Sequence, residues 1–327
     1  MRSADFDAEM ENTGRFARRH EAAKPFCLKG LLRAMEERWM PVVVSPLAGA
    51  FAGEVLGIDC RAPLDAEGVA AIREGMAQYA VLVCRDQPLT DEQQLAFARQ
   101  FGELERYDTP GHIRKREQER LDSGIADFSN LTRDGGPMTA DDRVWLFKLG
   151  DRLWHSDSSF RPVPAGYSLL SGRTIPPRGG DTEFADMRAA YDALDDAAKT
   201  EIEDLVCEHS LIYSREAIGF FDLSSEEREH FRPVRHRLVR VDPRTGRKSL
   251  FLSSHAGAIV GWTIPEARVF LRDLTEHATQ PKFVYRHRWR VGDLVMWDNG
   301  TTMHRARQFD RNEIRDVRRA TLAGSPG

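Results

Sequence analysis

Trp154-His155-Ser156-Asp157-Ser158 is the stretch that decides how this chain is interpreted. On a β-strand, residues i and i+2 point to the same face. A strand here would therefore present the imidazole of His155 and the carboxylate of Asp157 side by side. A His-x-Asp tripeptide alone is weak evidence, because the usual context is an ordinary surface strand. A second, distant histidine strengthens the interpretation.

That histidine is His304, which lies 147 residues beyond Asp157 (304 − 157) and just after a candidate buried strand and a glycine turn. A rolled sheet easily brings such distant positions together, although alone His304 would be interpreted as a loop histidine. With His155 and Asp157 it completes a set of two histidines and one carboxylate. Such a triad is typical of non-haem iron(II) sites and leaves coordination positions open.

Two arginines follow the distal histidine. Arg315 is 11 residues past His304 (315 − 304), and Arg319 is four residues further on. A guanidinium binds a carboxylate through two parallel hydrogen bonds, so either arginine could hold an acidic ligand. The run 315–319 could equally be a solvated charge run, and the residues alone leave both interpretations open.

Composition bounds the class of protein. The chain has 327 residues, of which 41% are hydrophobic and 30% charged, as in a soluble globular protein with a sizeable core. Its net charge of -4 comes from 47 basic and 51 acidic side chains, so we expect no nucleic-acid partner. No run of 18 apolar residues and no signal-peptide core is present, which predicts no membrane partner.

The four cysteines do not form a CxxC pair. Their spacing suits neither a zinc ribbon nor a disulfide scaffold, so we expect reduced thiols and a cytoplasmic location. Their positions are Cys27, Cys60, Cys84 and Cys207.

The N-terminal part differs from the rest of the chain. Residues 1–39 are charged and are expected to be a mobile or partly helical extension, whereas residues 40–327 form a single domain. Met40 could be the natural start of the protein. Alternatively, the preceding segment contains an ordinary helix that packs on the domain, and the sequence does not decide between the two.

Strands and helices alternate irregularly along the domain. Helices are predicted at 90–101, at 187–207 with a break near Asp195-Asp196, and at 263–277, the first and last beginning with capping boxes. Strands are predicted at 80–84, 153–158, 167–173, 182–185, 283–289, 294–297 and 318–322, with a hairpin from 234–242 to 248–253. Many short strands with a few helices favour a mostly β fold with flanking helices, a β-sandwich or jelly roll.

Taken together, the chain resembles the TauD/TfdA family of dioxygenases. The marks are Phe101-Gly102-Glu103-Leu104, Trp154–Phe160, Gly179-Gly180-Asp181-Thr182, Trp297-Asp298-Asn299, His304-Arg305-Ala306, Arg315 and Arg319. The resemblance implies a double-stranded β-helix (jelly roll) and a homo-oligomer. It also implies that His155, Asp157 and His304 are the metal ligands and the catalytic centre, that Thr182 and Arg315 bind 2-oxoglutarate, and that Arg319 binds the acidic head of the substrate.

The stretch Phe184–Tyr191 resembles the phenoxyalkanoate branch rather than the taurine branch. Taurine-type enzymes have a substrate-binding histidine soon after the FGxL segment, and His112 cannot be aligned with it. A loop histidine is the favoured interpretation of His112, and a substrate-binding role is the alternative. The other histidines fit no metal spacing and are expected to be structural or exposed: His209, His230, His236, His255, His277 and His287.

The resemblance implies an Fe(II)- and 2-oxoglutarate-dependent dioxygenase that uses O2 to hydroxylate a small anionic substrate. We expect an aryloxyalkanoate, cleaved at its ether to a phenol and an oxo-acid, with succinate and CO2 as coproducts. One alternative is a dioxygenase of alkyl sulfonates or sulfate esters. Another is a metal-binding jelly roll without redox turnover, which would have no need of Thr182 and Arg315 as a clamp for a dicarboxylate.

Overall fold

The structure is a computed structural model that describes residues 41–47, 51–105, 120–121 and 124–324. The expected N-terminal extension, residues 1–39, lies outside the described residues. No helix in the described ranges is both long and apolar enough to cross a membrane.

The strands are β1 (Val43–Pro46), β2 (Gly53–Leu56), β3 (Val81–Cys84), β4 (Ala126–Asp127), β5 (Ala165–Thr174), β6 (Thr182–Asp186), β7 (Val206–His209), β8 (Val234–Arg237), β9 (Val239–Val241), β10 (Lys248–Leu250), β11 (Ala256–Ile259), β12 (Val284–His287), β13 (Leu294–Asp298), β14 (Thr302–Ala306) and β15 (Asp316–Ala323).

The α-helices are α2 (Ala66–Tyr79), α3 (Asp91–Arg99), α4 (Arg143–Lys148), α5 (Met187–Asp192), α6 (Asp196–Ile202), α7 (Leu211–Ala217), α8 (Ser225–His230) and α9 (Ile264–Ala278). Short 3-10 turns are η2 (Leu149–Arg152) and η3 (Pro281–Phe283). The expectation of a mostly β fold with helices is therefore confirmed.

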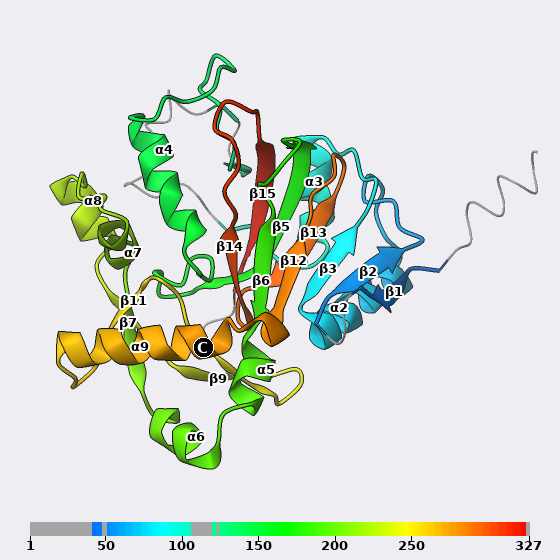
Figure 1. The fold of residues 1–327 in the computed structure, drawn as a ribbon. Coiled ribbons are helices and arrows are strands. Elements are labelled where there is room, and N and C mark those ends of the chain that lie inside the picture. The colour runs from blue at the N-terminus through cyan, green and yellow to red at the C-terminus, as the bar shows by residue number, and fades with distance from the viewer. Residues whose placement is uncertain (1–40, 48–50, 106–119, 122–123, 325–327) are drawn as a thin grey trace, which may run out of the picture. The chain divides into compact units, whose positions relative to one another are not determined.

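Within the described residues, seven strands form the main sheet in the order β1-β2-β3-β13-β5-β15-β4. β2 and β3 are parallel, and β13 pairs antiparallel with both β3 and β5. Figure 1 shows β15, β5 and β13 side by side in this sheet. β3 and β13 are buried along their whole length, as expected for central strands that are covered on both faces.

A second sheet, of three strands in the order β12-β6-β14, carries part of the candidate site. β6 pairs antiparallel with both neighbours, so that Phe184 lies directly opposite His304, and Thr182 opposite Ala306. Side chains from the two sheets share one hydrophobic cluster, in which Phe184 of β6 meets Trp297 of β13 and Leu170 of β5. The two sheets therefore face each other across this core.

Two predicted helices begin where their capping boxes predict. The side chain of Thr90 accepts from the backbone N–H of Gln93 at the start of α3, and Thr263 and Glu266 form a capping box at the start of α9. Each such cap contributes about 1 kcal/mol.

The predicted helix 187–207 is wrong in its last part. The chain forms α5 and α6, and then the strand β7 from Val206 to His209. Asp195 accepts from the backbone N–H of Ala198 and starts α6 as a new helix, which explains the predicted break. β7 pairs with both β8 and β11, so tertiary pairing overrides the helical periodicity of these residues.

Candidate active site

The predicted strand at 153–158 is wrong. The chain pairs only at His155, in an isolated antiparallel bridge with His304, and turns from Asp157 onward. In the bridge, each of the two histidines accepts a backbone hydrogen bond from the other, over 2.9 and 2.8 Å. At the turn, Ser158 has a left-handed φ of 52°, and its hydroxyl donates to Glu105 over 3.0 Å. The residues of the motif do come together, but through this bridge and turn.

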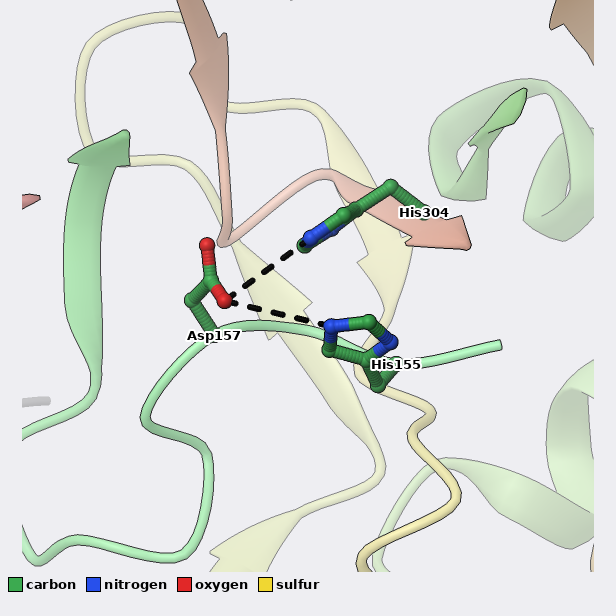
Figure 2. Close-up of side chains that lie close together, drawn as sticks. All are labelled: His155, Asp157 and His304. Atoms are coloured by element: carbon green, nitrogen blue, oxygen red, sulfur yellow. Dashed lines mark ion pairs between the residues drawn. The ribbon is translucent and has the colours of Figure 1, made fainter. Parts of the chain in front are cut away.

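His155, Asp157 and His304 form a buried cluster that could hold a metal ion. Oδ1 of Asp157 lies 3.9 Å from Nε2 of His155 and 3.7 Å from Nε2 of His304. Figure 2 shows both imidazoles directed toward this one carboxylate. Each separation is less than twice a typical metal–ligand bond of about 2.0–2.2 Å, so an ion between these atoms can contact both members of each pair.

The two imidazoles are held in the form that binds a metal. Nδ1 of His155 lies 2.8 Å from the carbonyl oxygen of Leu153, so it carries the hydrogen and leaves a lone pair on Nε2. The ring of His304 is stacked on Phe184 and lies against Trp297, with centroids 6.0 and 4.8 Å away. Burial is the largest cause that holds the pKa of His304 well below 6.5, so this imidazole is neutral at pH 7.

The carboxylate of Asp157 is ionised and tightly held. Burial alone would raise its pKa, but Arg319, the two triad histidines and a hydrogen bond from Ser168 outweigh burial and hold the pKa at about 2. Ser168 donates to Oδ2 over 2.7 Å, and Asn299 accepts from the backbone N–H of Asp157 over 3.2 Å. Two imidazole nitrogens and an anionic carboxylate oxygen are a donor set that fits iron(II).

Arg319 also reaches this carboxylate. It forms an ion pair with Oδ1 of Asp157, and its guanidinium lies over the ring of Phe128, 4.3 Å from the centroid. The aromatic face limits where this guanidinium can go. The structure thus brings the sequence-predicted substrate arginine to the triad itself.

Arg315 is a buried cation. Its Nε donates to the carbonyl oxygen of Gly180 over 3.1 Å, and only 6% of its surface is exposed. A Cβ at Gly180 would lie 3.2 Å from Cδ and Nε of Arg315, and the φ of +73° at this position also favours glycine. Gly180 therefore makes room for the side chain of Arg315.

The charge of Arg315 is not balanced by an ion pair with any residue in the described ranges. Burial lowers its pKa to about 10, opposed only by the charges of Asp151 and Asp181. A buried cation is costly unless an anion joins it. This guanidinium therefore suits the carboxylate of a ligand.

Thr182 lies on the same face of β6 as Phe184, because the two are separated by one residue on a strand. The ring of Phe184 is stacked on His304, so Thr182 shares the face that carries the triad histidine. Its backbone is two residues from Gly180, the acceptor of Arg315. Thr182 thus follows closely after the carbonyl group that holds Arg315, on the strand that pairs with the strand of His304.

The other histidines divide as expected into structural and exposed residues, with one unexpected position. His255 is buried, with its ring centroid 6.0 Å from that of His155 and 5.1 Å from that of Phe160, and its Nδ1 lies 2.9 Å from the hydroxyl of Ser214. No spacing in the sequence could indicate this contact, because its partners come from distant segments. His112 lies outside the described residues.

Comparisons with known proteins agree with this geometry. The family described as "Taurine catabolism dioxygenase TauD, TfdA family" matches residues 44–321. An alpha-ketoglutarate-dependent 2,4-dichlorophenoxyacetate dioxygenase of Cupriavidus pinatubonensis is 46% identical over 86% of this chain and 98% of its own. An (S)-phenoxypropionate/alpha-ketoglutarate-dioxygenase of Sphingobium herbicidovorans is 38% identical over 86% and 95%. The crystal structure of AAD-2 in complex with Mn(II) and N-oxalylglycine is 56% identical, with a TM-score of 0.84 over 88% of this chain and 99% of that one.

Proposed function

Because this chain belongs to the taurine catabolism dioxygenase TauD, TfdA family, we propose that it is an iron(II)- and 2-oxoglutarate-dependent dioxygenase of aryloxyalkanoates. One combination of observations carries the proposal: His155, Asp157 and His304 form a buried cluster, and the same domain buries a guanidinium, Arg315, that has no ion pair in the described ranges. A hydrolase or a metal sensor needs the first feature but not the second.

In this function, His155, Asp157 and His304 hold the iron. When bound, iron(II) together with 2-oxoglutarate and dioxygen supplies the oxidising power that hydroxylates a carbon, while 2-oxoglutarate becomes succinate and CO2. The chain itself binds, orients and shields the reactants. Phe184 and Trp297 pack against His304 and exclude water from that side of the cluster.

Thr182 and Arg315 bind the carboxylate of 2-oxoglutarate that lies away from the metal. The guanidinium balances the charge of that carboxylate, and the threonine hydroxyl adds a hydrogen bond. Gly180 sets the position of Arg315 through its carbonyl group and through its lack of a side chain. Without a bound dicarboxylate this buried cation has no close counter-charge among the residues described.

Arg319 binds the acidic head of the substrate. Its place over the ring of Phe128 and beside Asp157 puts a cation next to the reaction centre, where an anionic substrate would be held with a carbon near the metal. Hydroxylation of a carbon that bears an ether oxygen gives a hemiacetal. This product collapses to a phenol and an oxo-acid.

The substrate class is supported by the relatives, which act on 2,4-dichlorophenoxyacetate and (S)-phenoxypropionate and share 46% and 38% of their residues with this chain. We also propose that the two facing sheets form a double-stranded β-helix. The likeness to AAD-2, at a TM-score of 0.84, supports this assignment.

An anaerobic titration tests the function. The iron(II)–2-oxoglutarate complex of the protein is titrated with aryloxyacetates, 2-aryloxypropionates and alkyl sulfonates, and its visible absorption band is followed. Air is then admitted, and phenol and succinate are measured. Equimolar phenol and succinate from an aryloxy acid is the expected result. A spectral shift and turnover with sulfonates alone would replace the proposed substrate class, and the absence of any 2-oxoglutarate complex would overturn the function.

A further inference from the structure

The hydroxyl of Thr182 has a second partner besides the expected ligand. The indole Nε1–H of Trp289 donates to Oγ1 of Thr182 over 3.0 Å, and both side chains are buried. Trp289 lies two residues beyond His287, which is the residue opposite Thr182 in the pairing of β12 with β6. The indole thus reaches Thr182 from the neighbouring strand segment.

Counting hydrogens gives this contact a direction. A threonine hydroxyl has one hydrogen to donate, whereas an indole N–H can only donate. Trp289 therefore occupies a lone pair of Oγ1 and cannot accept the hydroxyl hydrogen. No residue in the described ranges accepts that hydrogen either, so it is left for a ligand.

Trp289 is itself held firmly in this orientation. The ring of His287 meets it edge to face, with centroids 4.6 Å apart, and Nε2 of His287 lies 3.1 Å from Oδ2 of Asp293. Arg85 pairs with the same oxygen of Asp293 over 2.6 Å. On the main sheet, Gly172 leaves room for the indole, because a Cβ there would lie 3.3 Å from its Cε3 atom.

We propose that Trp289 is a positioning residue of the cosubstrate site, whose indole N–H fixes the Thr182 hydroxyl as a hydrogen-bond donor to the distal carboxylate of 2-oxoglutarate. This inference rests on the proposed function. In this proposal Trp289 touches no ligand and acts on 2-oxoglutarate binding only through Thr182. Its effect should therefore appear in the binding of ligands that carry a distal carboxylate and in nothing else.

The test compares Trp289→Phe with the wild type by calorimetric titration of the Mn(II)-loaded protein without oxygen. Phenylalanine keeps an aromatic ring but has no N–H. We expect the Kd of 2-oxoglutarate to rise about five- to tenfold, the loss of roughly one well-directed hydrogen bond. The Kd of 2-oxobutyrate, which lacks the distal carboxylate, should change by less than twofold. In steady state, KM for 2-oxoglutarate should rise while kcat stays within twofold.

One double variant and one control variant make the result specific. In Thr182→Val, the further change Trp289→Phe should have no effect, because the hydroxyl that it orients is gone. Trp262→Phe, which lies just before α9 and away from these contacts, controls for the loss of an indole in general. Circular dichroism and thermal unfolding report whether each variant folds. If Trp289→Phe does not, benzothienylalanine at position 289 keeps the shape of the indole and removes only its N–H.

Unchanged 2-oxoglutarate affinity in a folded variant would overturn the role of Trp289, as would equal weakening of 2-oxobutyrate or an undiminished effect in the Thr182→Val background. In each of these cases the wild type still binds 2-oxoglutarate and the proposed function stands. A wild type that binds no 2-oxoglutarate would instead overturn the proposed function, and the role of Trp289 with it.

Discussion

Ser168 donates its hydroxyl hydrogen to Oδ2 of Asp157 over 2.7 Å, while Oδ1 of the same carboxylate faces the two triad imidazoles. The serine oxygen in turn accepts from Nδ2 of Asn299 over 2.9 Å, which leaves its single hydrogen for Asp157. Asn299 is oriented by the indole N–H of Trp297, which donates to its Oδ1 over 2.9 Å. This chain of hydrogen bonds fixes the plane of the carboxylate, so that one oxygen only is presented to a metal.

Ser168→Ala should therefore weaken metal binding. The carboxylate loses the partner of Oδ2 and can rotate, and loss of such a supporting hydrogen bond typically costs about 10-fold or more in metal affinity. Iron(II) affinity is measured by competition with a chelator under anaerobic conditions. Ser171→Ala is the matched control, because Ser171 lies on the same strand but donates to Gln94. Equal losses in the two variants would mean that the effect is one of general packing.

His155→Ala should abolish succinate formation that depends on the organic substrate. The change removes a nitrogen ligand and leaves a gap opposite Asp157, so we also expect iron(II) to bind far more weakly. His230→Ala, on the exposed end of α8, is the control and should behave as the wild type. Turnover that persists in His155→Ala would exclude this histidine from the metal centre.

Arg315→Lys should raise KM for 2-oxoglutarate about 10-fold or more, since an ammonium cannot make the paired hydrogen bonds of a guanidinium. It also loses the bond from Nε to the carbonyl oxygen of Gly180. Iron(II) affinity should not change. The control is Arg307→Lys. The side chain of Arg307 is 43% exposed, and its Nε lies 3.7 Å from Oε1 of Glu183. If both variants raise KM equally, the effect is one of overall charge.

Local sequence signals predicted local structure well. The caps at Thr90 and Thr263 depend on residues three positions away, and the helices that they predict are present. The prediction from His155-x-Asp157 was right about which side chains meet but wrong about the strand. The deciding contact is the backbone bridge from His155 to His304, whose partners are far apart in sequence.

Long-range contacts explain what the sequence could not predict. The bond from Ser168 to Asp157 depends on the turn after His155, and the bond from Asn299 to Ser168 on the pairing of β13 with β5. Trp289 meets Thr182 only because β12 pairs with β6. The spacing of residues along the chain does not reveal how these strands pair. The supporting residues Ser168, Asn299 and Trp289 were therefore missed, while the proposed metal and cosubstrate ligands were found.

A buried histidine away from the site should make stability depend on pH. His209 of β7 is fully buried, and neither ring nitrogen has a hydrogen-bond partner among the residues that the structure describes. Its ring is stacked on Phe251, and His236 and Arg240 lie close by. Burial, reinforced by the charges of these two residues, holds the pKa of His209 well below 6.5.

The sign of the effect follows from where the proton binds. As pH falls below about 6.5, the unfolded chain takes up a proton at His209 and the folded chain does not, so folding loses stability. The loss through this one residue reaches about 1.4 kcal/mol between pH 8 and pH 5.5. His209→Phe removes it, and at pH 8 the variant should be at least as stable, because no buried polar atom is left without a partner. Urea unfolding of the metal-free protein at the two pH values measures the difference, with the exposed His230→Phe as control. Parallel pH curves for His209→Phe and the wild type would show that His209 takes up its proton in the folded state as readily as in the unfolded one.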